Sequence, residues 1–149
     1  MKTKPLRLKA ADAEDLAIIA SVLQDALVDL GQFAYDPGLR RFAGLVVRFL
    51  HEECQFPASG PLRQVKAALT FDKVRAVRTR GLDQRRGGVH ELLTVTCSGD
   101  EEKGVRMGLL FAGGGAVRLE ADTVACRLAD VGDPWVSRLA PRHDTGVRR

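Results

Sequence analysis

Alternation of apolar and polar side chains dominates the C-terminal half of the chain and predicts antiparallel β-structure. The clearest stretch covers residues 107–128, where two alternating segments flank the triple glycine Gly113-Gly114-Gly115. A period of two places successive side chains on opposite faces of a strand, and glycine supplies the positive φ angles of a tight turn. We therefore expect strands at residues 105–111 and 116–128, joined as a hairpin.

A helical pattern occurs near the N-terminus. Apolar residues recur at three- and four-residue spacing over residues 16–23, and Asp12 stands at the position of an N-cap with two further acids in the first turn. The pattern predicts one helix that begins after Asp12 and ends near residues 24–27. A short strand is expected before it, at residues 6–9, where Leu and basic residues alternate.

Turn signals divide the rest of the body into further strands. Asp36-Pro37-Gly38 separates two apolar segments, residues 28–35 and 42–50, which are expected to pair as a hairpin. Another strand is expected to begin near residue 65, and one more is expected at residues 91–98.

The alternation changes parity twice, near Asp72–Lys73 and near Thr123–Val124. One extra residue moves every later side chain to the opposite face of a strand, so each change predicts a β-bulge within one continuous strand.

These elements predict an α+β fold: one N-terminal helix followed by about six mostly antiparallel, bulged strands that form a curved sheet or partial barrel. A length of 149 residues suits a single domain. Its body is expected at about residues 6–130, with a C-terminal tail at 131–149 anchored by Trp135. The pattern does not distinguish a barrel from an open sheet or define the oligomeric state, although an uncovered edge strand would offer a seam for a homodimer.

Composition favours a soluble cytoplasmic protein. The apolar fraction is 45% and the charged fraction 28%, and no apolar run approaches the roughly 20 residues that cross a bilayer. The basic N-terminus lacks the apolar core of a signal peptide. The three cysteines, Cys54, Cys97 and Cys126, contain no C-x-x-C pair, and an odd number argues against a disulfide framework. Cys97 and Cys126 are expected as small buried side chains.

Charge is distributed unevenly around a net value of +4. Residues 12–29 carry five acids and no base, whereas residues 63–86 carry eight bases and two acids. Arginine is always charged and binds phosphate or carboxylate through two parallel hydrogen bonds. The basic strand and loop at residues 73–86 are therefore the candidate site for an anion or a partner, unless the acidic helix neutralises them. The candidate residues are Lys73, Arg75, Arg78, Arg80, Arg85 and Arg86.

The chain resembles a family of small uncharacterised bacterial proteins known as a domain of unknown function. The resemblance implies a soluble, single-domain bacterial protein and supplies no activity and no catalytic residue. It spans nearly the whole chain and is carried by five stretches: DAEDLAIIASVLQDA (12–26), FAYDPGLRRFA (33–43), FDKVRAVRTRGLD (71–83), FAGGGAVRLEAD (111–122) and DVGDPW (130–135).

Motifs that would indicate an enzyme are weak. The triple glycine is followed by a strand, whereas a phosphate-binding loop precedes a helix. The segment His51-Glu52-Glu53-Cys54 lacks the spacing of a zinc site, although His51 and Glu53 would share a strand face and His90 could join them. No catalytic, cofactor-binding or metal-binding residue is predicted, and no cofactor.

Three functions remain open on the sequence alone. The first is a non-catalytic binding or scaffold protein that docks a protein or a small ligand on its curved sheet. The second is a nucleic-acid or anion-binding module that uses residues 73–86, although only eight aromatic residues are present to stack on bases and Phe71 and Phe111 fall in the expected core. The third is an enzyme whose site is assembled from dispersed residues.

Overall fold

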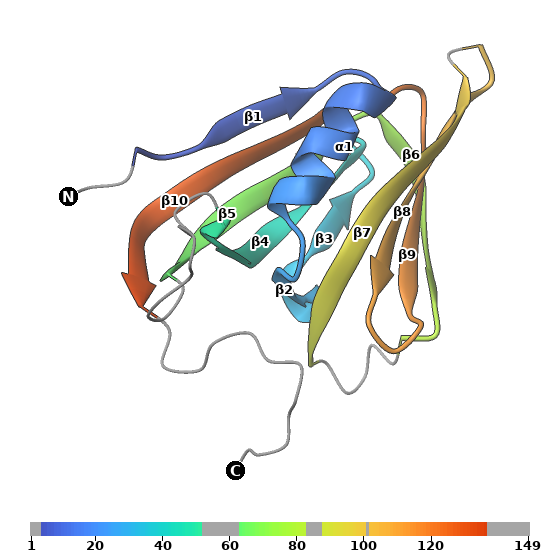
Figure 1. Ribbon diagram of the computed structural model, residues 1–149. Coiled ribbons are helices and arrows are strands. Elements are labelled where there is room, and N and C mark those ends of the chain that lie inside the picture. Colours follow the sequence, from blue (N-terminus) through green and yellow to red (C-terminus); the bar gives the residue numbers. More distant parts are fainter. Residues whose placement is uncertain (1–3, 52–62, 83–87, 101, 137–149) are drawn as a thin grey trace.

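The structure, a computed structural model, describes residues 4–51, 63–82, 88–100 and 102–136 (Figure 1). Within these ranges the fold is mostly β, with one α-helix and ten strands, so the expected six strands were too few and α+β describes the fold only roughly. The elements are β1 (Arg7–Ala10), α1 (Ala13–Val22), β2 (Leu27–Asp29), the 3-10 turn η1 (Leu30–Gln32), β3 (Ala34–Asp36), β4 (Arg41–Phe49), β5 (Arg63–Phe71), β6 (Val74–Arg80), β7 (Val89–Asp100), β8 (Gly104–Phe111), β9 (Ala116–Ala121) and β10 (Cys126–Val136).

Helix α1 begins where the sequence predicts. The Asp12 carboxylate accepts a hydrogen bond from the backbone N–H of Asp15 at 2.8 Å, which confirms Asp12 as the N-cap. The helix ends at Val22, earlier than expected, because the chain turns through a left-handed Asp25 (φ 68°) to start β2. The N–H of Asp25 donates to the carbonyl oxygen of Leu92 at 3.0 Å, so this turn is attached to β7.

The segment expected as the first arm of a hairpin, residues 28–35, is divided into two short strands. The Asp29 carboxylate accepts a hydrogen bond from the N–H of Gly31 at 3.0 Å and thereby starts the η1 turn between β2 and β3. The turn predicted at residues 36–38 is present, and β3 and β4 pair across it.

The strands form one open antiparallel sheet in the order β1-β10-β5-β4-β2-β7-β8-β9-β6, with β3 paired to β4. We call β1–β5 with β10 the first half and β6–β9 the second half. Strand β7 joins the two halves, because residues 89–91 pair with β2 and residues 92–100 pair with β8. Helix α1 contacts β1 in the first half and β7 in the second, and so bridges the halves on one side (Figure 1).

On the other side, the chain itself connects the halves at two corners. The first corner is Asp72–Lys73, between β5 and β6, and the second is residues 122–125, between β9 and β10. The corners lie side by side, since the N–H of Asp72 donates to Ala125 at 2.8 Å and the N–H of Asp122 donates to Lys73 at 3.0 Å. The prediction of a bulge at each of these positions was wrong. The parity of the alternation changes there because the chain passes from a strand of one half to a strand of the other. A register shift does occur just beyond, between Val74 and Ala76.

Ion pairs hold the first corner. The Asp72 carboxylate accepts hydrogen bonds from Nε of Arg41 in β4 at 2.6 Å and from Nη2 of Arg127 in β10 at 3.0 Å. Partial burial raises the pKa of Asp72, but the hydrogen bonds and charges of the two arginines outweigh burial and hold this pKa below its ordinary value.

Asp72→Asn is therefore expected to change how stability depends on pH. A carboxyl whose pKa is lower in the folded state stabilises the fold above its unfolded pKa, and this stabilisation disappears as pH falls through the folded value. We expect the variant to lose about 0.5–1 kcal/mol at pH 7, because the pair is partly exposed. The deficit should shrink as the pH falls below about 4. Urea unfolding at both pH values measures the difference. Glu102→Gln, the same charge change at an exposed residue, should show no such trend, and a deficit independent of pH would contradict the prediction.

The inner faces of both halves form the core, which contains one buried ion pair. Arg48 of β4 is fully buried, and its Nε and Nη2 each donate to the Asp130 carboxylate of β10 at 2.8 Å. The backbone N–H of Leu6 donates to the same carboxylate at 3.0 Å. A buried charge is tolerated when it is paired and hydrogen-bonded, as here.

Strand β10 extends past its predicted end near Leu128 to Val136. A register shift between Val131 and Trp135 interrupts the pairing, and Trp135 then lies opposite Gln64 of β5 with 39% of its surface exposed. Apolar periodicity is lost here because the last residues of β10 are largely exposed.

Candidate anion-binding site

The outward-facing side chains of the second half form a regular grid, because the registers of three strand pairs line up. Arg78 of β6 lies opposite Arg118 of β9, and Arg118 lies opposite Gly108 of β8. Gly108 in turn lies opposite Thr96 of β7. These four residues form one row across the strands, about 4.8 Å from strand to strand.

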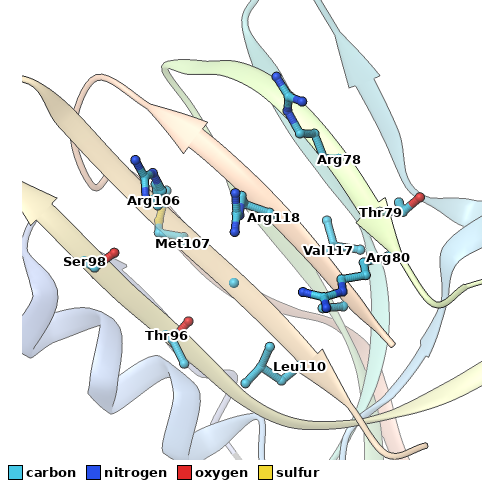
Figure 2. A pocket seen from close by; sticks show the side chains of 12 residues that line it. Arg78, Thr79, Arg80, Thr96, Ser98, Arg106, Met107, Leu110, Val117 and Arg118 are labelled. Carbon is cyan, nitrogen blue, oxygen red and sulfur yellow. The ribbon is translucent and has the colours of Figure 1, made fainter. Parts of the chain in front are cut away.

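Two further arginines flank this row. Arg80 lies two residues from Arg78 along β6, and Arg106 lies two residues from Gly108 along β8, on the other side of the row. The grid encloses an open groove of about 550 Å³, which we call the arginine groove. Figure 2 shows Arg118 and Arg80 on one side of it and Thr96 and Ser98 on the facing strand. The polar lining of the groove comes from Arg78, Thr79, Arg80, Thr96, Ser98, Arg106 and Arg118, and Met107, Leu110, Ala116 and Val117 add apolar surface beside Gly108.

Gly108 forms the floor of the arginine groove. A Cβ atom at this position would meet the Thr96 Oγ1 at 2.8 Å, so a side chain would fill the middle of the groove. Glycine weakens the interior of a strand and often marks a place where a ligand or another backbone approaches closely. The glycine thus leaves space between the arginines and the hydroxyl groups of β7.

Positive charge in the groove is only partly neutralised. The Arg78 Nε lies 3.7 Å from the Glu120 Oε2, and Arg78 remains largely exposed. Within the described part of the chain, Arg80, Arg106 and Arg118 form no ion pair. Four guanidinium groups therefore face one carboxylate. Like charges directly opposite each other on neighbouring strands destabilise a sheet, and Arg78 and Arg118 are such a pair.

The structure brings together two of the six residues predicted as a candidate site. Arg78 and Arg80 line the groove, whereas Arg75 is turned to the second corner. Its Nε lies 3.2 Å from the Asp122 carboxylate and its Nη2 donates to the Ala121 carbonyl oxygen at 3.1 Å. Lys73 occupies the first corner in a left-handed conformation (φ 63°). Arg85 and Arg86 lie outside the described residues.

Among the described residues, the ion pairs of β6 go to β9 and to the second corner, and not to the acidic helix. Arg75 pairs with Asp122 and Arg78 with Glu120. Asp122 also pairs with Arg40, whose hydrogen bond is the main cause that lowers the pKa of Asp122.

Sequence reasoning missed Arg106 and Arg118. Alternation places Arg118 on the same strand face as Glu120 and Asp122, a mixture of charges that is typical of an ordinary solvated surface. What makes it part of a site is the pairing of β9 with β6, strands separated by about 40 residues of chain. No pattern within a short stretch of sequence predicts the pairing of strands so far apart in the chain.

The residues considered for an enzyme have other partners. The His51 Nε2 lies 3.0 Å from the Gln24 carbonyl oxygen, and the His90 ring packs 5.7 Å from the Phe111 ring. Glu53 lies outside the described residues. Over the described ranges, no three His, Cys, Asp or Glu side chains gather as metal ligands would. Gly113 and Gly114 have φ of 92° and 98° in the turn between β8 and β9, which confirms their predicted role.

Two cysteines lie at inward positions as predicted. Cys126 is buried, and burial raises its thiol pKa to about 12, which keeps the group protonated and inert. Cys97 is half-buried, and burial raises its pKa as well. Cys54 lies outside the described residues.

Among the described helices, none has the length and apolar character needed to cross a bilayer.

Comparison with known proteins places the chain in a family. No curated protein matches the chain, and no solved structure matches it. The family model described as "Protein of unknown function (DUF2948)" matches residues 6–143, nearly the full length, and the chain belongs to this family.

Proposed function

We propose that the protein is a non-catalytic binding module that holds an anionic partner in the arginine groove. The observation that carries this proposal is the direct opposition of Arg78 and Arg118 beside a glycine floor. This arrangement costs stability when the groove is empty. A phosphate or carboxylate group between the two guanidinium groups replaces their repulsion with charge-assisted hydrogen bonds.

The surroundings of the groove suit such groups. Arginine retains its charge at every physiological pH, and its planar fork matches both phosphate and carboxylate oxygens. Thr96 and Ser98 add hydroxyl donors from β7, on the side of the groove opposite the arginines of β6 and β9 (Figure 2). Among the described residues, Arg80 and Arg118 form no ion pair, and Arg106 forms none although Glu120 lies opposite it on β9.

Nucleic acid is the second candidate partner. Arginine and hydroxyl side chains are common donors to phosphate oxygens, and the net charge of +4 favours attraction to a polyanion. Among the residues that the structure describes, however, no aromatic side chain lines the groove. A nucleic acid would be held there through its phosphates and without base stacking, and thus without preference for sequence.

The proposal includes a bacterial cytoplasmic setting. The cytoplasmic setting is supported by the odd number of cysteines, which contain no C-x-x-C pair, and by the burial of Cys126 as a packed side chain.

Reversal of two groove charges tests the proposal. The variant Arg80→Glu/Arg118→Glu is compared with the wild type by fluorescence anisotropy, with labelled oligothymidylate and labelled polyglutamate as probes. We expect the wild type to bind at least one probe at about 20 mM salt and to weaken linearly in log salt. The variant should lose about tenfold or more in affinity, because close charge pairs become repulsive.

The matched control is Lys9→Glu/Lys66→Glu, which changes the net charge equally on exposed residues of β1 and β5. It should retain most of the affinity, and circular dichroism checks that both variants fold. Equal losses in the two variants would mean attraction by net charge alone. That result, or the absence of binding to both probes, would overturn the proposal.

A further inference from the structure

Strand β6 is an uncovered edge of the sheet. It ends the strand order, and its single sheet neighbour within the described ranges is β9. Among the described residues, hydrogen bonds on the free side involve only its first residue: the Val74 N–H donates to the Arg40 carbonyl oxygen at 2.8 Å, and the Val74 carbonyl oxygen accepts from the Tyr35 hydroxyl at 2.7 Å. Every second residue from 75 to 80 therefore points its backbone donor and acceptor to the free side, over a length typical of a natural strand.

The outer face of this edge is cationic with a regular spacing. Arg78 and Arg80 are two residues apart, about 6.6–6.8 Å along the strand, and Arg118 stands behind them on β9. A chain added alongside β6 has the same two-residue repeat. Carboxylates at its alternate positions would face Arg78 and Arg80 directly and form the opposite-charge cross-strand pairs that this edge lacks.

The inner face of the edge is incompletely covered. Val77 packs against the core but remains half-buried, and Thr79, with the same parity, is exposed. The other set of side chains from an added strand would lie beside these two residues. Small apolar side chains fit there, because they would cover the margin of the core without burying a charge.

The other end of the sheet differs. Strand β1 also carries exposed basic residues at two-residue spacing, Arg7 and Lys9, but it has only four residues and contacts α1. Behind it on β10, Ala129 lies opposite Arg7 and Arg127 lies opposite Lys9. The Arg127 guanidinium is paired with Asp72 at 3.0 Å.

We propose that β6 binds an extended segment of a partner protein as an additional β-strand, with acidic residues at alternate positions and small apolar residues between them. This inference rests on the proposed function, because the acidic side chains would pair with Arg78 and Arg80 at the margin of the arginine groove, on the side away from β9. Strand addition supplies affinity through backbone hydrogen bonds and specificity through alternate side chains. A protein partner is favoured over nucleic acid because the free backbone edge continues the cationic face and no aromatic side chain is among the described residues that line the groove.

Labelled peptides test this mode of binding. The probe is a peptide in which Glu alternates with Val, compared with a peptide of the same composition in which the Glu residues form one block. We expect the alternating peptide to bind about tenfold or more tightly than the block peptide, since only alternation places every carboxylate on one face. The same comparison with Arg7→Glu/Lys9→Glu protein should be unchanged.

Backbone methylation provides the decisive control. Methylation of every second peptide nitrogen removes the donors on one edge of the added strand and leaves the side chains intact. Methylation on one edge should weaken binding about tenfold or more, whereas methylation on the other edge should have little effect. In addition, Arg78→Glu/Arg80→Glu protein should reject the Glu-Val peptide and bind a Lys-Val peptide.

The outcomes separate this inference from the proposed function. If both methylated peptides bind equally well, or the block peptide equals the alternating one, the groove binds anions by charge alone and strand addition is overturned. If oligothymidylate binds and no peptide does, the nucleic-acid candidate replaces it. If neither peptides nor polyanions bind, both proposals fail.

Discussion

Asp130→Ala is expected to lower the free energy of unfolding by about 3–5 kcal/mol. The substitution leaves the Arg48 guanidinium without its carboxylate at a fully buried position and leaves the Leu6 N–H without its acceptor. Removal of one member of a buried charge pair costs several-fold more than the loss of a typical surface interaction. Since whole proteins are stable by only about 5–15 kcal/mol, urea unfolding at pH 7 should show a large shift of the midpoint.

A double substitution separates the charge from the packing. Arg48→Met/Asp130→Leu removes both charges and keeps apolar volume, and it should recover most of the lost stability. A small cost for Asp130→Ala, below about 1 kcal/mol, would show that water reaches the Arg48 guanidinium. Equal costs for the single and double variants would show that packing, and not charge, is responsible.

Phe71→Ala is expected to cost about 3–5 kcal/mol. Phe71 is the last residue of β5, is fully buried, and lies opposite both Phe42 of β4 and Cys126 of β10. Removal of the ring opens a cavity immediately before the first corner, where the chain is held on both sides and cannot collapse into the space. Thermal and urea unfolding measure the loss.

Two variants calibrate this result. Phe71→Leu retains most of the volume and should cost clearly less than Phe71→Ala. Leu93→Ala truncates a side chain that is 49% exposed, and it should cost less than about 1 kcal/mol. If Phe71→Ala behaved like Leu93→Ala, the ring would not be part of the core.

Elements that depend on near neighbours could be predicted from the sequence. The cap at Asp12, the turn at residues 36–38 and the glycine turn between β8 and β9 each rest on contacts within a few residues. Residues a few positions apart in the sequence are therefore enough to predict these elements. The long β7 and β8 strands show the same local character, because a short connection joins them.

The corners show where this reasoning stops. A strand that bulges and a strand that passes into another part of the sheet both invert the alternation, so the parity change at Asp72–Lys73 has two structural causes. The choice depends on partners far along the chain: β5 pairs with β4 and β10, while β6 pairs with β9. The candidate site was half predicted for the same reason, since Arg78 and Arg80 are close in sequence but Arg106 and Arg118 join them only through the sheet.

The place of β10 between β1 and β5 has a consequence for synthesis on the ribosome. The first half cannot be completed until the last strand has left the exit tunnel, because that strand joins the N-terminal segment to the sheet. The hairpins of β7, β8 and β9 need only sequence neighbours and can form earlier, since loop closure is fastest for local contacts. Until β10 has emerged, the edge of β5 that pairs with it stays uncovered, and a nascent chain stalled before residue 126 is prone to aggregation.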